Sequence, residues 1–518
     1  MSNHTDMVIK RTLSIPRLAL LVGVVACVAL GLWYGKSSFV NSPNARPWFA
    51  AYVDATLTPA FSFQTLGGET AANAVLSFIV ATPNAPCVPA WGAAYSLDQA
   101  NASLSLDARL ARLKQRGGEA IVSFGGRDNQ ELSVGCTDES KLYDAYNGVV
   151  ERYDSTTIDL DLEGSTLADK DAGERRARVM AKLQADRRAS GKAFAVWLTL
   201  PATPQGLSEP GTQMVEIFLN AKVDLAGVNV MTMNYGESLQ GMSMVEGSVQ
   251  ALTNTHRQLK ILYERTGVSL SNATLWSKIG ATPMIGQNDL AGEIVTVQGA
   301  EALNAFAVQA GIGRMSMWSA NRDIACGSNY VNLTRVSNSC SGVPQEREEF
   351  MRVLSAGFDG TISSSSELVT APDAKAEKTT EIIDDPAQSP YQIWTATGVY
   401  LEGEKIVWKK NVYQAKWWTQ GEVPDNPVLQ SWETPWELIG PVLPGDKPIP
   451  QATLPAGKYP EWSGTATYNA GQRVVLGGVP YQAKWWTQGD SPAATAVDPN
   501  SSPWVPLTQA QINELLKK

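Results

Sequence analysis

The sequence has little histidine and no excess of positive charge. Only His4 and His256 occur among 518 residues. A zinc centre of histidine ligands is therefore hard to build, and a Ser-His-Asp triad would need His256, which lies in a polar helical stretch and is expected at the surface. The net charge is −9 and the Lys and Arg residues are scattered, which argues against a nucleic-acid surface. Catalysis must use carboxylates, and we expect no metal and no cofactor.

Cysteine is also sparse. Of five cysteines, one lies in an N-terminal apolar run, and the other four are Cys87, Cys136, Cys326 and Cys340. Outside the cytoplasm, an even number suggests two disulfides. Three pairings are possible. We favour Cys87–Cys136 and Cys326–Cys340, because each joins loops that are near in sequence; four separate buried thiols are the alternative.

The N-terminus is typical of an export segment. Lys10, Arg11 and Arg17 precede an apolar run at 18–34, which is 17 residues, or roughly 25 Å as a helix, and marginal for spanning a bilayer. The residues after it offer a poor cleavage site, so a cleaved signal peptide and an uncleaved membrane anchor both stay open. In either case the rest of the chain is expected to be extracytoplasmic.

The C-terminal part contains two copies of one small unit. Residues 413–421, Tyr-Gln-Ala-Lys-Trp-Trp-Thr-Gln-Gly, recur identically at 481–489. Runs at 405–408 and 473–476 predict antiparallel hairpins, so we expect two all-β modules. The expected division is 1–45 as cytoplasmic tail and export signal or anchor, 46–365 as a large domain, 366–390 as linker, 391–440 as module 1, 441–458 as linker, 459–506 as module 2 and 507–518 as tail.

Each module carries two adjacent tryptophans, Trp417 and Trp418 in the first and Trp485 and Trp486 in the second. Neighbours on a strand face opposite ways, so at least one ring of each pair is expected to be exposed, or the pair to lie in a turn. Exposed flat rings suit stacking on the apolar faces of sugars. The alternative is that both rings pack a small core.

The large domain alternates predicted strands and helices. The strands are expected at 48–53, 74–80, 120–124, 157–162, 194–200, 227–233, 279–284 and 314–318, with helices including 106–115, 172–189 and 211–221. This alternation predicts an α/β fold, namely a (β/α)₈ TIM barrel with catalytic groups at the carboxyl ends of its strands. Periodicity alone does not separate it from an open doubly wound sheet.

The fourth predicted strand carries a ladder of carboxyls. Asp159, Asp161 and Glu163 are two residues apart, so they share one face, and Leu160 and Leu162 point the other way. Three buried anions are costly unless they share protons. The main alternative to catalysis is a calcium site. Coupling raises at least one pKa, and we expect Glu163 to be the residue kept protonated as general acid.

At this point the sequence resembles glycoside hydrolase family 18. The ladder is similar to that family's Asp-x-Asp-x-Glu signature, 123–126 (Ser-Phe-Gly-Gly) to its Ser-x-Gly-Gly motif, 231–235 (Met-Thr-Met-Asn-Tyr) to its sixth-strand motif, and 317–318 (Met-Trp) to its eighth strand. The repeats resemble carbohydrate-binding modules of family 5/12. The chain departs from the family at Asn234, where an aspartate is common; Asn can hydrogen-bond but cannot titrate.

The resemblance implies a substrate-assisted retaining mechanism. In it Glu163 would be the acid/base, Asp161 would orient the substrate acetamido group, and Asp159 would tune Asp161 from behind. Tyr235 and Asn234 would position the acetamido carbonyl. The residues expected to bind substrate are Trp318, Met231 and Gln287 in the barrel and Trp417, Trp418, Trp485 and Trp486 in the modules.

The function predicted from this resemblance is chitin hydrolysis, with chitin and chitooligosaccharides as partners, no nucleic acid, and a monomeric chain. An endo-β-N-acetylglucosaminidase acting on glycans or peptidoglycan would use the same mechanism. A non-catalytic chitin-binding lectin is a further alternative, against which the intact Glu163 argues.

Overall fold

The computed structural model describes residues 46–66, 73–328, 335–366, 383–442, 454–455, 457–493, 502–507 and 509–517. The expected signal or anchor at 18–34 lies outside these ranges. Within them, no helix is both long and apolar enough to cross a membrane.

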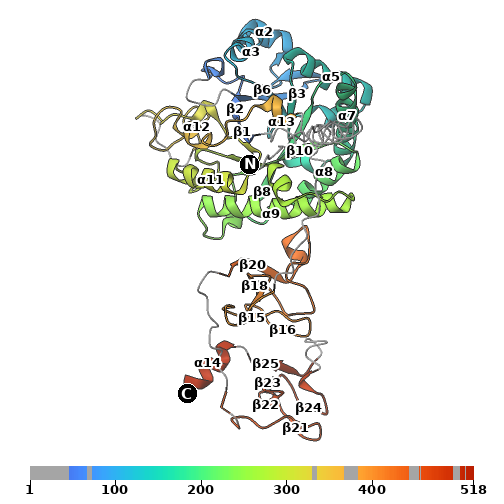
Figure 1. The fold of residues 1–518 in the computed structure, drawn as a ribbon, viewed down its shortest axis with the longest axis vertical. Coiled ribbons are helices and arrows are strands. Elements are labelled where there is room, and N and C mark those ends of the chain that lie inside the picture. The colour runs from blue at the N-terminus through green and yellow to red at the C-terminus, as the bar shows by residue number, and fades with distance from the viewer. Residues whose placement is uncertain are drawn as a thin grey trace, which may run out of the picture.

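Parallel strands in the large domain close into a barrel (Figure 1). Its first position is split, since β1 (Trp48–Phe49) pairs with β14 (Arg314–Met315) and β2 (Ala51–Asp54) pairs with β3 (Ala74–Thr82). The strands between follow in chain order: β6 (Ala120–Gly125), β7 (Thr157–Asp161), β8 (Ala195–Thr203), β10 (Leu225–Thr232) and β11 (Ile279–Pro283). Because the last strand pairs with the first, the open-sheet alternative is wrong and the TIM-barrel prediction is confirmed.

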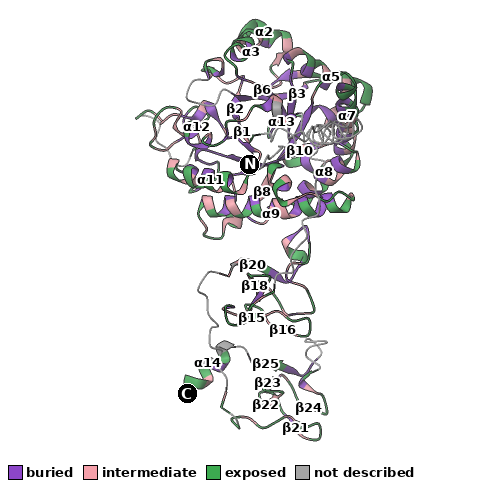
Figure 2. Ribbon diagram, viewed as in Figure 1, coloured by how far each residue is buried: buried purple, intermediate pink, exposed green. Residues whose placement is uncertain are grey.

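Helices surround the barrel and bury its strands (Figure 2). The principal ones are α3 (Leu106–Gln115), α5 (Glu139–Tyr153), α7 (Lys170–Ala189), α8 (Glu209–Asn220), α9 (Met244–Arg265), α11 (Val297–Ala310) and α12 (Glu349–Leu354). Polar caps fix where several begin: the Asp169 carboxylate accepts the backbone N–H of Ala172 at the start of α7. Leu160 and Leu162 face this outer layer and are fully buried in its core, as the predicted alternation requires.

Both favoured disulfides are present. Cys87, on the inserted strand β4 (Ala85–Trp91), is bonded to Cys136 at the end of α4 (Leu132–Gly135). Cys326 and Cys340 close a loop beyond the last barrel strand. The first bond ties the inserted strand β4 to the end of α4, and the second closes a single loop.

The expectation for His256 is wrong. It lies on α9 and is partly buried, with its ring stacked on Trp276 at a centroid distance of 4.3 Å. Burial lowers the pKa of the imidazole below its usual value, so it packs as a neutral ring.

The repeats fold as small β-modules. In module 1, β17 (Lys405–Trp408), β18 (Asn411–Ala415) and β20 (Trp436–Pro441) form an antiparallel sheet. Module 2 repeats this with β22 (Arg473–Leu476), β23 (Val479–Ala483) and β25 (Trp504–Pro506). Both predicted hairpin runs are thus strands, and each core is built on a tryptophan, Trp436 or Trp504.

Module 1 contacts the barrel through the loop between β19 (Thr419–Gln420) and β20. Leu429 packs into the barrel core, and its carbonyl accepts a hydrogen bond from Gln258 of α9 at 2.6 Å. Gln430 donates to the Thr212 hydroxyl of α8 at 3.1 Å. The side chains of Gln258 and Thr212 are almost fully buried by this contact, so the loop fills a gap between α8 and α9.

Candidate active site

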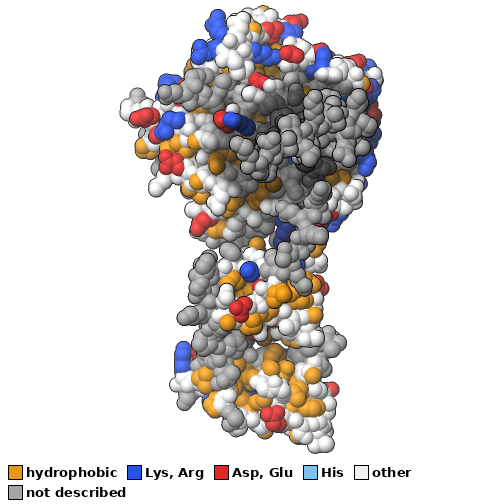
Figure 3. Space-filling view, in the orientation of Figure 1, with side chains coloured by type: hydrophobic (Ala, Val, Ile, Leu, Met, Phe, Trp, Pro, Cys, Tyr) orange, Lys and Arg blue, Asp and Glu red, His pale blue; other side chains and the backbone are white. Residues whose placement is uncertain are grey.

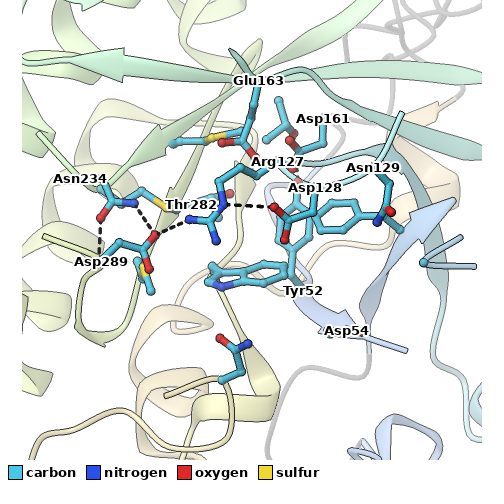
Figure 4. Close-up of a pocket in the computed structure, with 18 of the residues that line it drawn as sticks. Tyr52, Asp54, Arg127, Asp128, Asn129, Asp161, Glu163, Asn234, Thr282 and Asp289 are labelled. Atoms are coloured by element: carbon cyan, nitrogen blue, oxygen red, sulfur yellow. Dashed lines mark hydrogen bonds and ion pairs between the residues drawn. The ribbon is translucent and has the colours of Figure 1, made fainter. Parts of the chain in front are cut away.

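The carboxyl ladder opens into a cavity of about 290 Å³ at the carboxyl ends of the barrel strands (Figure 4). Asp161 ends β7, and Glu163 lies two residues beyond it, before the short helix α6 (Gly164–Ala168). Both line the cavity, whereas Asp159 is fully buried below them. The strand therefore delivers its last two carboxyls to the cleft and keeps the first as a support.

Asp159 has a full set of partners. One oxygen accepts from Arg314 at 2.6 Å and from the Thr199 hydroxyl at 2.6 Å, and the other accepts from the hydroxyls of Tyr52 at 2.8 Å and Ser123 at 2.7 Å. The Arg314 ion pair is completely buried. The sequence argument that three anions must share protons is thus wrong for Asp159, because Arg314 compensates its charge.

The same contacts bear on the calcium alternative. With both oxygens of Asp159 occupied by donors, the ladder has no free bidentate ligand at its base. Among the residues that the structure describes, no group of three or more His, Cys, Asp or Glu side chains is arranged to hold a metal ion.

Asp161 and Glu163 form a hydrogen-bonded carboxyl pair that retains a proton. Burial raises the pKa of Asp161 well above its ordinary value, and the nearby charges of Glu163 and Asp159 raise it further. Burial also raises the pKa of Glu163, while Arg127 and the hydrogen bond from Asp161 oppose that rise. The proton therefore belongs to the pair as a unit, and Glu163, whose pKa is raised as the sequence predicts, is one of its two holders.

Beside this pair, an ion-paired network joins the segments that follow β6, β10 and β11 at the cleft. The Arg127 guanidinium contacts the Asp289 carboxylate at 3.1 Å. Asn234 donates its side-chain N–H to the same carboxylate at 3.1 Å, and its side-chain oxygen accepts the Asp289 backbone N–H at 3.0 Å. Both polar groups of Asn234 are therefore engaged by Asp289, as the dashed lines of Figure 4 mark.

Two expected site residues do not reach the cleft. Tyr235 is buried in the core, its hydroxyl bonded to Ser248 of α9, and it does not line the cavity. The reason is local: Asn234 takes a left-handed φ of 55°, which breaks the alternation after β10. Gln287 is also buried away from the cavity, in the hairpin of β12 (Gly286–Gln287) and β13 (Ile294–Val295).

The cleft floor is aromatic and sulfur-containing. Trp318, after the last strand, stacks on Phe78 with ring centroids 5.7 Å apart and planes 16° from parallel. Tyr52 from β2 lies against both rings. Met231 lines the cavity as expected. Trp318 and Met231 are thus where the sequence placed them, whereas Tyr52, Phe78 and Arg127 were missed.

Arg314 was missed as well, and one signal in the sequence could have revealed it together with its partner Tyr52. Arg314 opens a predicted barrel strand, where a charged residue needs a buried partner. Its guanidinium packs between the rings of Trp48 and Trp197, at 5.4 and 5.5 Å from their centroids. It also donates to the Tyr52 hydroxyl at 3.0 Å. Arg314 therefore fixes the first and eighth strands beneath the ladder.

The adjacent tryptophans of the modules are exposed. Each pair lies in the bend that follows β18 or β23, and Trp417, Trp485 and Trp486 are 44%, 45% and 59% exposed. Trp418 is partly buried. Hydrophobic side chains gather on the visible face of both modules (Figure 3). The alternative that both rings of each pair fill a core is wrong.

Comparisons with known proteins agree with this architecture. The chain is similar to a probable bifunctional chitinase/lysozyme of Escherichia coli, with 32% identity over 309 residues (57% of this chain, 33% of the relative). It is also similar to endochitinase 11 of Metarhizium anisopliae, with 31% identity over 305 residues (56% of each). The chain thus spans between a third and about half of the length of these relatives.

The barrel is also similar to solved structures. The catalytic domain of a chitinase from Pyrococcus furiosus is 27% identical, with a TM-score of 0.52 over 61% of this chain and 97% of that one. A model of carbohydrate-binding module family 5/12 matches residues 461–505. The resemblance to family 18 chitinases carrying a family 5/12 module is therefore confirmed.

Proposed function

We propose that this relative of the family 18 chitinases hydrolyses the β-1,4 linkages between N-acetylglucosamine units of chitin, and that its C-terminal modules hold it on the polymer. One observation carries the proposal: a proton-sharing pair, Asp161 and Glu163, opens onto a cleft whose floor is the Trp318 ring. Catalytic-site mutants of active domain 2 of a Pyrococcus furiosus chitinase, which is also similar to this chain, were solved with chito-oligosaccharides, and this supports the same substrate class here.

The proton must lie on Glu163 when the bond is cleaved. Burial raises the pKa of both Asp161 and Glu163, so the pair holds a proton between its two carboxyls. An acetamido N–H of the substrate needs an acceptor, and hydrogen bonding to the ionised carboxylate lowers the pKa of Asp161. The proton then passes to Glu163, which lies at the rim and faces the glycosidic oxygen.

The reaction that follows is substrate-assisted. Glu163 gives its proton to the glycosidic oxygen while the acetamido oxygen attacks the anomeric carbon, so one C–O bond forms as the other breaks. The positive charge of the resulting oxazolinium ring lies beside ionised Asp161. Water then attacks the anomeric carbon and gives its proton to Glu163, which restores the acid and the acetamido group.

Asp159 acts at a distance in this scheme. Its hydrogen bonds go to Arg314, Tyr52, Ser123 and Thr199 and none is free for Asp161, so its influence on Asp161 is the repulsion between two nearby carboxyls. That repulsion raises the pKa of Asp161 and keeps the proton available to the pair. The predicted tuning role is thus electrostatic.

The reaction is proposed to take place outside the cytoplasm. The two disulfides support an oxidising environment. Cell fractionation with N-terminal sequencing of the mature protein distinguishes a cleaved signal from a retained anchor at 18–34. The predicted monomeric state is checked by light scattering.

The test of the function is release of chitooligosaccharides from colloidal chitin. Glu163→Gln keeps the shape of the side chain and removes the acid, so we expect kcat to fall about 10²–10⁴-fold. Unchanged folding is verified by circular dichroism. Equal release by this variant and the wild type, or no release by the wild type with rapid cleavage of N-glycans, would reject the proposal.

A further inference from the structure

The Arg127–Asp289 ion pair crosses the mouth of the barrel. Arg127 follows β6, the third strand position, and Asp289 follows β11, the seventh. In an eight-stranded barrel these positions lie on opposite sides. Figure 4 shows the Arg127 side chain reaching across the pocket towards Asp289 and Asn234. The two loops are thereby joined over the open end of the barrel.

This bridge separates the two halves of the proposed site. Asp161 and Glu163 come from the fourth strand and its loop, on one side of the line joining Arg127 to Asp289. Trp318 and Tyr52 come from the eighth and first strands, on the other side. A sugar that rests on Trp318 and presents its linkage to Glu163 must occupy the line of the bridge. The closed cavity, at about 290 Å³, is also at the small end of ligand clefts.

The two partners are held to very different degrees. Asp289 is fixed by Asn234 on both its side chain and its backbone, and the preceding Asn288 is buried with bonds to the Met284 and Gly286 carbonyls. Arg127 is 67% exposed, and a second carboxylate, Asp128, lies 3.6 Å from its guanidinium. Arg127 can therefore leave Asp289 without losing a counter-ion, while Asp289 stays in place.

We propose that the Arg127–Asp289 bridge is opened by the substrate, and that Arg127 is thereby a specificity-determining residue that weakens binding of any sugar chain long enough to span the cleft. The inference rests on the proposed function. Breaking an exposed ion pair costs little, so the penalty is modest. It is also screened by salt, because Arg127 is solvent-exposed.

The experiment measures KM for chitotetraose with the full chain, so that cleavage reports only the barrel. Arg127→Gln, Asp289→Asn and the double variant are compared with wild type, each at its own pH optimum. We expect each single change to lower KM about two- to fivefold with kcat nearly unchanged, and the double variant to add nothing further. Raising the ionic strength should lower KM of the wild type and leave that of Arg127→Gln constant.

A matched control comes from the other end of the barrel. Arg46 and Asp359 form an ion pair of 3.0 Å, and the Arg46 side chain is about as exposed as that of Arg127, at 72% against 67%. Arg46→Gln therefore removes the same kind of interaction and should leave KM unchanged. An unaltered or higher KM in Arg127→Gln overturns the proposal, since a higher value would mean that Arg127 holds the sugar. Absence of any cleavage by the wild type would reject the proposed function instead.

Discussion

The barrel and the modules place their aromatic side chains in opposite ways. In the barrel, Trp318 lies at the bottom of a cleft, stacked on Phe78 and backed by Tyr52. In the modules, Trp417 and Trp485 stand out from a bend, each about half exposed. The first arrangement places one ring among the charged groups of a cleft, and the second leaves a flat ring exposed to solvent.

The difference teaches how one chain separates chemistry from adhesion. Proton transfer needs carboxyls whose pKa is raised by burial, as at Asp161 and Glu163. The buried carboxylate beneath them, Asp159, needs a counter-ion, which is Arg314. Stacking on an insoluble polymer needs only accessible rings on a small rigid unit. We therefore expect substitutions in one region to leave the function of the other intact, and the following predictions test that independence.

The largest effect is expected from Arg314→Met. It leaves Asp159 buried without its counter-ion, which should lower the free energy of unfolding of the barrel by about 3–5 kcal/mol. Urea denaturation followed by fluorescence measures this loss. The double variant Arg314→Met, Asp159→Asn removes the isolated charge and should recover part of it. No difference between the single and double variants would contradict the role assigned to the ion pair.

Asp161→Asn comes next. It removes the acceptor for the acetamido group and the proton-sharing partner of Glu163, so kcat should fall about 10²–10³-fold. Retention on insoluble chitin should be unchanged, because the modules are untouched. If retention on chitin falls together with kcat, the barrel and the modules do not act independently.

Parts of this site were accessible from the sequence because they follow from strand alternation. Asp159, Asp161 and the two leucines between the carboxyls lie where a period of two puts them. Arg314 and Asp159 are 155 residues apart, and no local pattern reveals such a contact. Alternation also fails at Asn234, whose left-handed φ turns Tyr235 out of the cleft.

In the modules, Trp417→Ala with Trp485→Ala tests adhesion. Removing one exposed ring from each should weaken binding to insoluble chitin about tenfold or more, since stacked aromatic rings dominate such interfaces. Cleavage of chitotetraose should be almost unchanged. Depletion assays on chitin and soluble-substrate kinetics measure the two quantities. A matching loss of soluble cleavage would show that module and cleft are not independent.

Module 1 is attached to the barrel through Leu429, and Leu429→Ala tests what this contact contributes. Leu429 of module 1 packs into the barrel, so its truncation should loosen module 1 and lower hydrolysis of insoluble chitin about two- to threefold. The equivalent position in module 2 is Val497, and Val497→Ala is the control. Equal effects of both changes would contradict a special role for the docked loop.

The smallest expected effect is a difference in pH dependence between chitin binding by the modules and cleavage by the barrel. Binding by tryptophan rings involves no titrating group, so retention on chitin should be flat with pH, whereas cleavage should fall as pH rises through the raised pKa of the Asp161–Glu163 pair. The charged groups that act on Glu163 are Arg127, Asp161, Asp128 and Asp289.

Arg127 stabilises the ionised form of Glu163 and so lowers its pKa against the effect of burial. Arg127→Gln removes that cation, and the alkaline limb of kcat should therefore move to higher pH, by a fraction of a unit. Asp128→Asn removes an anion, which should move the same limb to lower pH. If Arg127→Gln and Asp128→Asn shift the limb in the same direction, the charges of these two residues do not set the pKa of Glu163. Burial alone would then determine the pH profile of cleavage.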